Sequence, residues 1–224
     1  MSLKGVIFDV DGVLLDTMHV WTDAGARYLQ SLGVKAEAGL GDKLFTMTVD
    51  MGAVYVKERY ALAQSTEEIT RGINGVVAGY YADEAAFKPG ARQLLERLKT
   101  EGIPMTIASS TTEDYVRTAF DRLGYTGYFA EILSCVQWKT SKAEPKIFFE
   151  AMKIMGTKPS ETWLFEDGLY SVKTAKTAGL KTVGVYDPVS EKEQAELSQT
   201  VDIYVRTLEE LDFDRLLGVP SLER

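Results

Sequence analysis

The sequence predicts an α/β fold, with a doubly wound, mostly parallel sheet and an inserted all-helical domain. Three observations support this prediction. Short apolar runs alternate with helical patterns, residues 16–87 lack any convincing strand, and the first apolar run ends in carboxylates. The chain has 224 residues, 45% hydrophobic and 26% charged, which is typical of a globular protein with one large or two small domains.

Short runs of apolar and β-branched residues are typical of buried strands. The expected strands are residues 4–9, 104–109, 131–135, 162–166, 181–187 and 202–206. Parallel strands that are covered on both faces have this nearly continuous apolar character.

Helical patterns separate most of the expected strands. The expected helices are residues 91–99, 113–123, a segment that begins near Pro145, and 172–178, which Gly179 ends. Ser110 and Glu113 have the spacing of a capping box for the second of these helices. Alternating strands and helices indicate right-handed crossovers and a mostly parallel sheet.

Residues 16–87 interrupt this alternation and are expected to form a separate helical domain. One helical face carries Val20, Trp21, Ala24, Tyr28 and Leu32. Ser65 and Glu68 form a second capping-box spacing. The expected domains are therefore residues 1–15 with 88–224, and residues 16–87. Two linkers, near Asp16 and near Lys88, would allow a hinge.

The rare residues exclude several kinds of chemistry. The chain has one histidine, His19, and one cysteine, Cys135. A Cys/His zinc site and an intrachain disulfide are therefore both excluded, and no Gly-x-Ser-x-Gly elbow is present. A Cys135–His19 dyad remains as an alternative, although a lone cysteine is more often a small buried hydrophobe. Carboxylates, lysines, hydroxyls and backbone amides are the expected catalytic groups.

The charge and the N-terminal segment bear on partners and location. The formal net charge is −8, whereas nucleic-acid binding needs a basic surface. The first apolar run is interrupted by Asp9 and Asp11, so it does not resemble a signal peptide, and no stretch approaches ~20 apolar residues. We expect a cytoplasmic protein without nucleic-acid or membrane partners; the sequence does not indicate an oligomeric state.

The most informative motif is Asp9-Val-Asp11-Gly12, which continues to Asp16. Its first two carboxylates follow a buried strand, at the end where parallel sheets bind ligands. Burying negative charge is costly unless something binds it, and a divalent cation fits this requirement. The alternative, a solvated Asp-Gly turn, explains Asp11 and Gly12 but not Asp9 within an apolar run.

This motif resembles the first motif of the haloacid dehalogenase superfamily of phosphatases and mutases. Three further segments resemble the remaining motifs in the family's order. They are Ser109-Ser110 after an apolar strand, Lys142 ahead of Pro145 and a helix, and Glu166-Asp167 after another apolar strand. The resemblance spans residues 9–179 and implies a Rossmann-like core sheet.

The resemblance implies a role for each motif. Asp9 would be the nucleophile that forms an aspartyl-phosphate, and Asp11 the general acid and then the general base. Ser109, the backbone amide of Ser110, and Lys142 would bind the phosphoryl group. The expected reaction is Mg²⁺-dependent hydrolysis of a small phosphorylated metabolite.

The resemblance also implies a Mg²⁺ site. Asp9, the backbone carbonyl of Asp11, and Asp167 would hold the ion, with Glu166 in support or acting through water. Oxygen ligands of this kind suit Mg²⁺, which keeps several of its waters.

The chain departs from the family pattern around the third and fourth motifs. Lys146 occupies a position where relatives usually have Asp, and Ala143 one where they often have Pro. This leaves open whether Lys142 or Lys146 is the active-site lysine, although the spacing to Pro145 favours Lys142. Gly168 and Ser171 also depart from the common pattern.

Residues 16–87 resemble the cap domain of the β-phosphoglucomutase-like branch. Thr17, His19 and Trp21 lie close to the first motif, and we hypothesise that some of them contact the leaving group. The alternatives are that Trp21 belongs to the core of the cap and that His19 is a surface or capping residue.

The family contains several activities, and the residues favour a phosphatase. The mutase of this branch holds a second phosphate with an Arg in its cap, and residues 43–49 contain none. A general acid at Asp11 also argues against dehalogenases. The alternatives are a β-phosphoglucomutase-type mutase and a family member that binds a phosphorylated ligand without turnover. A receiver domain, which uses a similar acidic pair and Lys, is much shorter than this chain.

Overall fold

The computed structural model describes residues 3–217. The chain forms two compact units. The first comprises the residues up to Asp16 and from Ala86 onward, and the second is Thr17–Ala85. These limits differ by one and two residues from the boundaries at 15/16 and 87/88 that the sequence indicates.

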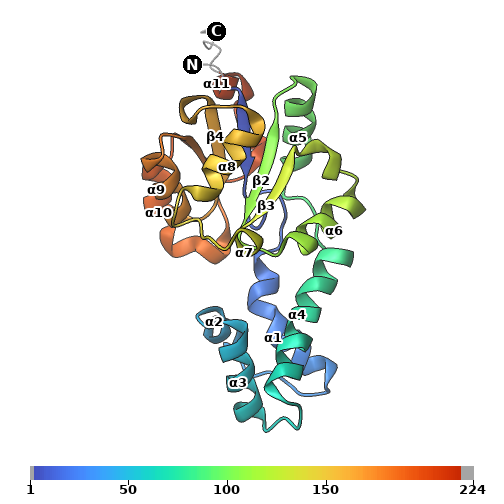
Figure 1. Ribbon diagram of the computed structural model, residues 1–224. Helices are drawn as coiled ribbons and strands as arrows, with labels where there is room; N and C mark the ends of the chain where they lie inside the picture. Colours follow the sequence, from blue (N-terminus) through green and yellow to red (C-terminus); the bar gives the residue numbers. More distant parts are fainter. Residues whose placement is uncertain (1–2, 218–224) are drawn as a thin grey trace. The chain divides into compact units, whose positions relative to one another are not determined.

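The first unit is built on one parallel sheet (Figure 1). Its strands are β1 (Gly5–Phe8), β2 (Met105–Ser109), β3 (Glu131–Ser134), β4 (Thr162–Glu166), β5 (Lys181–Val185) and β6 (Ile203–Val205). Their order is β3-β2-β1-β4-β5-β6, and every pair is parallel. The predicted doubly wound α/β fold is confirmed.

Helices cover both faces of this sheet. They are α5 (Ala91–Thr100), α6 (Glu113–Leu123), α7 (Cys135–Trp138), α8 (Lys146–Met155), α9 (Leu169–Thr177), α10 (Gln194–Thr200) and α11 (Phe213–Leu217). Right-handed crossovers place α5 and α6 on one face, because the chain moves from β1 through β2 to β3. They place α8, α9 and α10 on the other face, because the chain then moves from β3 to β4 and outward. Figure 1 shows α6 and α9 on opposite sides of the sheet.

The central strands are buried on both faces, which explains their continuous apolar character. On one face, Ile7 of β1 and Leu164 of β4 belong to a buried cluster that includes Phe148 of α8. On the other face, the rings of Phe8 and Phe165 pack with their centroids 4.8 Å apart. Residues of β1 therefore alternate between two cores, while their backbone pairs with β2 and β4.

The second unit is helical, as predicted. It contains α1 (Met18–Ser31), α2 (Leu40–Phe45), α3 (Val49–Tyr60) and α4 (Thr66–Asp83). Helix α1 packs on α2 and α4, and α3 packs on α4. The capping box of Ser65 and Glu68 is present at the start of α4. The predicted apolar face of α1 is confirmed at Val20, Ala24 and Tyr28, but Leu32 lies beyond the helix and is exposed.

The predicted capping box of Ser110 and Glu113 is wrong. Helix α6 begins at Glu113 with Thr112 as its N-cap, and no side chain caps it. The Ser-x-x-Glu spacing is present, but the chain after β2 is held by other bonds. The backbone amide of Thr111 donates to Ser109 Oγ, which keeps Ser110 in the loop rather than at the cap.

The helices bear on possible membrane insertion. Within residues 3–217, no helix combines the length and apolar character needed to cross a bilayer.

Candidate active site

The sequence-predicted residues of the first unit converge at the carboxyl ends of β2, β1 and β4. Ser109 and Glu166 are the last residues of β2 and β4, and Asp9 follows β1 directly. Because β1 lies between β2 and β4, their carboxyl ends share one edge of the sheet. The connections reverse direction at this point, which is where open α/β sheets bind ligands.

The loop after β1 is held in a fixed shape. The backbone amide of Asp9 donates to Phe165 O of β4, at 3.0 Å. The carbonyl of Val10 accepts from the amides of Leu14 and Leu15, at 2.9 Å each. Gly12 has a φ of +79°, which favours glycine at this turn. Asp9 and Asp11 therefore leave a short, tightly bonded segment at the strand end.

Lys142 is the lysine that reaches the acidic residues. Its Nζ lies 2.5 Å from Asp9 Oδ1 and 2.9 Å from Glu166 Oε2, and its side chain is 2% exposed. Lys146 is exposed, and its Nζ approaches the Trp138 carbonyl at 3.4 Å. The structure thus places Lys142, rather than Lys146, beside Asp9.

Glu166 accepts hydrogen bonds on both carboxylate oxygens. Oε2 accepts from Lys142 Nζ and from Ser171 Oγ, at 2.9 and 2.7 Å. Oε1 accepts from the backbone amides of Asp167 and Gly168, at 3.2 and 3.1 Å. Ser171 and Gly168, the two departures from the family pattern, therefore both hold Glu166.

The acidic residues form a cluster that could hold a metal ion. Carboxylate oxygens of Asp9, Glu166 and Asp167 lie within 4.8 Å of one another, and all three residues are buried. The set consists of hard oxygen donors, which suits Mg²⁺. Asp167 Oδ2 accepts from Ser190 Oγ at 3.3 Å. Because Glu166 already accepts four hydrogen bonds, Asp9 and Asp167 are the better placed ligands.

The metal-free cluster is electrostatically strained. Burial, followed by the charge of Glu166, raises the pKa of Asp9 well above its ordinary range, although Lys142 opposes the shift. Burial and the charges of Glu166 and Asp9 likewise raise the pKa of Asp167. Burial also acts against ionised Glu166, but Lys142 and its hydrogen bonds outweigh this and lower its pKa. Despite burial, the charges of Asp9 and Glu166 raise the pKa of Lys142.

In EDTA, without a bound metal ion, the free energy of unfolding is expected to decrease as the pH rises. Asp9 and Asp167 have raised pKa values in the folded protein. In EDTA and above pH 3.8, the folded protein therefore binds more protons than the unfolded chain does. The free energy of unfolding then decreases with pH, and thermal melts between about pH 5.5 and about pH 8 should show this decrease. The pKa of Glu166 is lowered and that of Lys142 is raised. Their contributions to the pH dependence of stability therefore lie below this window for Glu166 and above it for Lys142.

Two additions make this pH experiment specific to the cluster. Mg²⁺ should raise the melting temperature most at the higher pH, because it binds the ionised carboxylates. Asp167→Asn in EDTA should show a shallower decrease than the parent protein. A parent protein in EDTA that gains stability across this pH window would contradict the expected strain.

Hydroxyl groups also come from the end of β2 and from the loop that follows it. Ser109 is fully buried, and its Oγ accepts from the Thr111 amide at 3.0 Å. Ser110 is exposed. A group that binds a ligand must be at least partly accessible, and Ser110 meets this condition. Thr111 Oγ1 donates to Asp11 Oδ2 at 2.7 Å. Sequence reasoning missed Thr111, and its place directly after the Ser109-Ser110 pair is the only signal that could have indicated it.

Lys88 is a partly buried cation near the site, which sequence reasoning did not place there. Its Nζ donates to the carbonyls of Gly12 and Tyr186, at 2.8 and 2.9 Å, and to Asp187 Oδ2 at 2.8 Å. It therefore ties the loop after β1 to the loop after β5. Asp187 is almost fully buried and the Lys88 side chain is 11% exposed, so this ion pair is largely shielded from water.

The residues expected to contact a leaving group lie in the second unit. Thr17 is fully buried. The ring of His19 meets Tyr80 edge-on, with centroids 5.1 Å apart. Trp21 lines an apolar hollow of about 200 Å³ together with Phe45 and Met47. Their contact with a substrate stays a prediction. Cys135 is buried beneath α8 in the first unit.

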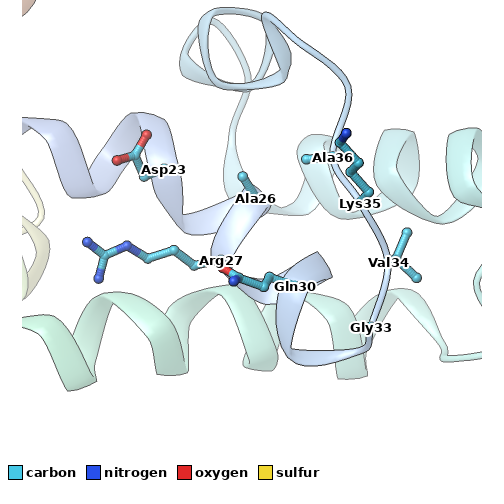
Figure 2. Close-up of a pocket in the computed structure, with 8 residues that line it drawn as sticks. All are labelled: Asp23, Ala26, Arg27, Gln30, Gly33, Val34, Lys35 and Ala36. Atoms are coloured by element: carbon cyan, nitrogen blue, oxygen red, sulfur yellow. The ribbon is translucent and has the colours of Figure 1, made fainter.

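A larger hollow, of about 470 Å³, lies in the second unit and is shown in Figure 2. Side chains of α1 and the following segment line it, among them Asp23, Arg27, Gln30 and Lys35. Arg27 is paired with Glu84 at 3.0 Å. Within the described residues, the group of acids suited to a metal is the one in the first unit. That cluster, rather than the larger hollow, is the candidate active site.

The family is established by comparison with known proteins. The model of haloacid dehalogenase-like hydrolases matches residues 6–185, which include all four motifs. The chain therefore belongs to the haloacid dehalogenase-like hydrolases. Its inserted helical unit, Thr17–Ala85, gives it the helical-cap architecture of that superfamily, and phosphatases are among its named relatives.

Curated relatives of the chain carry phosphatase names. The chain is 26% identical to a phosphorylated carbohydrates phosphatase of Thermotoga maritima over 181 residues, covering 81% of this chain and 84% of the relative. It is 30% identical over 188 residues to a Drosophila melanogaster protein provisionally named a pseudouridine-5′-phosphatase, covering 81% of each.

Solved structures share the fold over nearly the whole chain. A Thermotoga maritima protein provisionally named a β-phosphoglucomutase superposes with a TM-score of 0.81 at 25% identity. The match covers 97% of this chain and 98% of that protein.

Proposed function

We propose that this chain hydrolyses a small phosphate monoester in two Mg²⁺-dependent steps, through an aspartyl-phosphate on Asp9. One observation carries the proposal. At the strand end, buried Lys142 contacts both Asp9 and Glu166, whose carboxylates cluster with that of Asp167, and Asp11 follows Asp9 by two residues. A nucleophile, a cation for the phosphoryl group, metal ligands and a second carboxyl for proton transfer are thus gathered in one place.

In the first step, a carboxylate oxygen of Asp9 attacks phosphorus while the ester oxygen departs. Asp11, in its protonated form, gives its proton to that departing oxygen. Lys142 and the hydroxyl of Ser109 hold the phosphoryl oxygens, and the backbone amide of Ser110 adds a third donor. The attack and the proton transfer release an alcohol and leave the phosphoryl group on Asp9.

In the second step, Asp11 serves as the base. It takes a proton from water as that water attacks phosphorus, and the Asp9 carboxylate is released together with inorganic phosphate. Splitting hydrolysis into two displacements lets the same carboxyl act first as acid and then as base. Asp9 and Asp11 both return to their starting forms.

The donor set supports a divalent ion held by Asp9, Asp167 and the backbone carbonyl of Asp11. When bound, Mg²⁺ supplies positive charge that lowers the repulsion between the phosphoryl oxygens and Asp9. Glu166 acts mainly by holding Lys142 in place, because its four hydrogen bonds occupy both oxygens. The raised pKa values of Asp9 and Asp167 support the need for such a cation.

We further propose that residues 17–85 act as the cap of the enzyme, joined through hinges near Asp16 and Lys88, and that its residues select the substrate. Thr17, His19 and Trp21 are the proposed leaving-group contacts. The relatives' names favour phosphorylated carbohydrates or nucleoside phosphates as the class to test first.

A mutase is the second candidate, favoured by the likeness to the structure provisionally named a β-phosphoglucomutase. A mutase must hold a second phosphate, for which Arg is the strongest ligand. Lys43, the cation at the start of the Arg-free segment 43–49, is engaged by Tyr55, with Nζ 3.0 Å from its hydroxyl. This favours a phosphatase.

The decisive experiment is phosphate release from a panel of phosphate monoesters, with Mg²⁺ and with EDTA. We expect release that requires Mg²⁺ and differs strongly between esters. Absence of release from every ester would overturn the phosphatase proposal. Sugar 1-phosphates with a bisphosphate activator would then distinguish a mutase from a protein that only binds its ligand.

A further inference from the structure

A hydrogen bond joins two loops of the active site whose residues lie 100 positions apart. Thr111 Oγ1, from the loop after β2, lies 2.7 Å from Asp11 Oδ2, in the loop after β1. Both residues are buried, at 5% and 8% exposure. A buried hydroxyl–carboxylate bond this short has a defined direction, because the hydroxyl must donate to an ionised carboxylate.

We propose that Thr111 is a positioning residue that orients the Asp11 carboxyl, so that Oδ1 rather than Oδ2 exchanges a proton with the substrate. The inference rests on the proposed function, because it concerns the acid and base of that reaction. Thr111 itself touches neither phosphorus nor the leaving oxygen in this scheme.

The geometry around Thr111 suits such a role. Its backbone amide donates to Ser109 Oγ at 3.0 Å, while its side chain donates to Asp11. Threonine is β-branched, so its χ1 has few accessible rotamers. A residue fixed through its backbone and restricted at χ1 can hold a carboxyl in one orientation.

The hydrogen bonds also determine where the mobile protons lie. With Oδ2 accepting from Thr111, the proton of protonated Asp11 resides on Oδ1. Similarly, Ser109 Oγ accepts from the Thr111 amide, so the Ser109 hydroxyl hydrogen remains available for a phosphoryl oxygen. Thr111 thereby prepares one donor for the phosphoryl group and one for the leaving group.

The proton transfers balance as follows. A bond forms from an Asp9 oxygen to phosphorus, the bond from phosphorus to the ester oxygen breaks, and its electron pair stays on that oxygen, which takes the Oδ1 proton of Asp11. In the second half, a water oxygen bonds to phosphorus and gives a proton to Asp11 Oδ1. The bond between phosphorus and Asp9 then breaks, and its electron pair returns to the carboxylate.

Leaving-group dependence tests this assignment. An alkyl phosphate needs a proton on its leaving oxygen, whereas 4-nitrophenolate leaves readily without one. Thr111→Val removes the hydroxyl at nearly the same shape. We expect kcat/KM for the best alkyl phosphate of the panel to fall by about 10- to 100-fold, since general acids contribute about 10²- to 10⁴-fold. For 4-nitrophenyl phosphate, the fall should be several times smaller.

Three further variants make the test specific. Thr111→Ser keeps the hydroxyl and should recover most of the lost kcat/KM. Thr118→Val makes the same replacement at an exposed position of α6, where the hydroxyl bonds only to the Asp114 carbonyl, and should match the parent protein. If Thr111→Val fails to fold in thermal melts, Thr111→Ala takes its place.

The outcomes separate this inference from the proposed function. Equal loss on both esters, no loss on either, or no recovery in Thr111→Ser would each overturn the role of Thr111, although the parent enzyme remains a phosphatase. A parent protein without activity on any ester would instead overturn the proposed function itself.

Discussion

Asp9→Asn is expected to lower Mg²⁺-dependent phosphate release by more than about 10⁴-fold, as removal of a covalent nucleophile does in other enzymes. The amide keeps the size of the carboxyl but cannot attack phosphorus, so no acyl-phosphate intermediate forms. The measurement is steady-state phosphate release from the best ester of the panel, with parent and variant at equal concentration. Release that persists in the variant would show that another residue is the nucleophile.

Stability distinguishes lost chemistry from lost folding in this variant. Burial and the charge of Glu166 raise the pKa of Asp9, so ionised Asp9 is disfavoured in the metal-free protein. Asp9→Asn should therefore melt no lower than the parent protein in EDTA at neutral pH. It should gain less from added Mg²⁺, because it has lost a ligand. A much lower melting temperature in EDTA would mean that the loss of activity reports misfolding.

Lys142→Met is expected to remove activity and to destabilise the fold. Lys142 Nζ lies against Asp9 and Glu166, and the side chain is 2% exposed. Removing one partner of a buried ion pair leaves uncompensated charge, which costs about 3–5 kcal/mol of unfolding free energy. Urea unfolding at neutral pH in EDTA measures this loss, and added Mg²⁺ should restore part of it by taking over the cationic role.

Lys146→Met is the matched control, because Lys146 lies on the same segment but is exposed, with its Nζ 3.4 Å from the Trp138 carbonyl. Its unfolding free energy should change by less than about 0.5 kcal/mol, as for most surface substitutions. Its phosphatase activity should match that of the parent protein. The opposite ranking of the two variants would mean that Lys146 is the active-site lysine.

The fold was largely predictable because its buried strands leave a strong pattern. Phe8 and Phe165 lie near the ends of apolar runs, and their rings pack together in the core. A strand with one exposed face would instead alternate apolar and polar residues. The helical insert was predictable for a different reason, since a long segment lacked strands and carried the Ser65–Glu68 cap. The predicted capping box at Ser110 was wrong because the Ser-x-x-Glu spacing does not show which group a hydroxyl will bond to in the folded chain.

The site was predictable only in part, for a related physical reason. Carboxylates at strand ends, such as Asp9 and Glu166, are conspicuous because buried charge is rare and costly. Thr111 and Ser171 are common loop and helix residues, and their bonds to Asp11 and Glu166 depend on how distant segments align. Lys88 likewise has no local signature, because its partners at Gly12 and Asp187 come from two other loops.

The junction between the two units has a consequence for how the chain assembles. Strand β1 is synthesised first, yet its neighbours β2 and β4 follow only after residues 105 and 162. Residues 17–85 emerge in between, and their helices contact one another, so they can fold from local contacts.

Once the helical unit has folded, the entropy of closing the long loop between β1 and β2 is already spent. Its ends then meet where the Asp16 amide donates to the Ala86 carbonyl at 2.9 Å, and Leu15 pairs with Phe87. We therefore expect folding of the insert to bring the chain that leads to β2 back beside the end of β1, which favours pairing of these two strands.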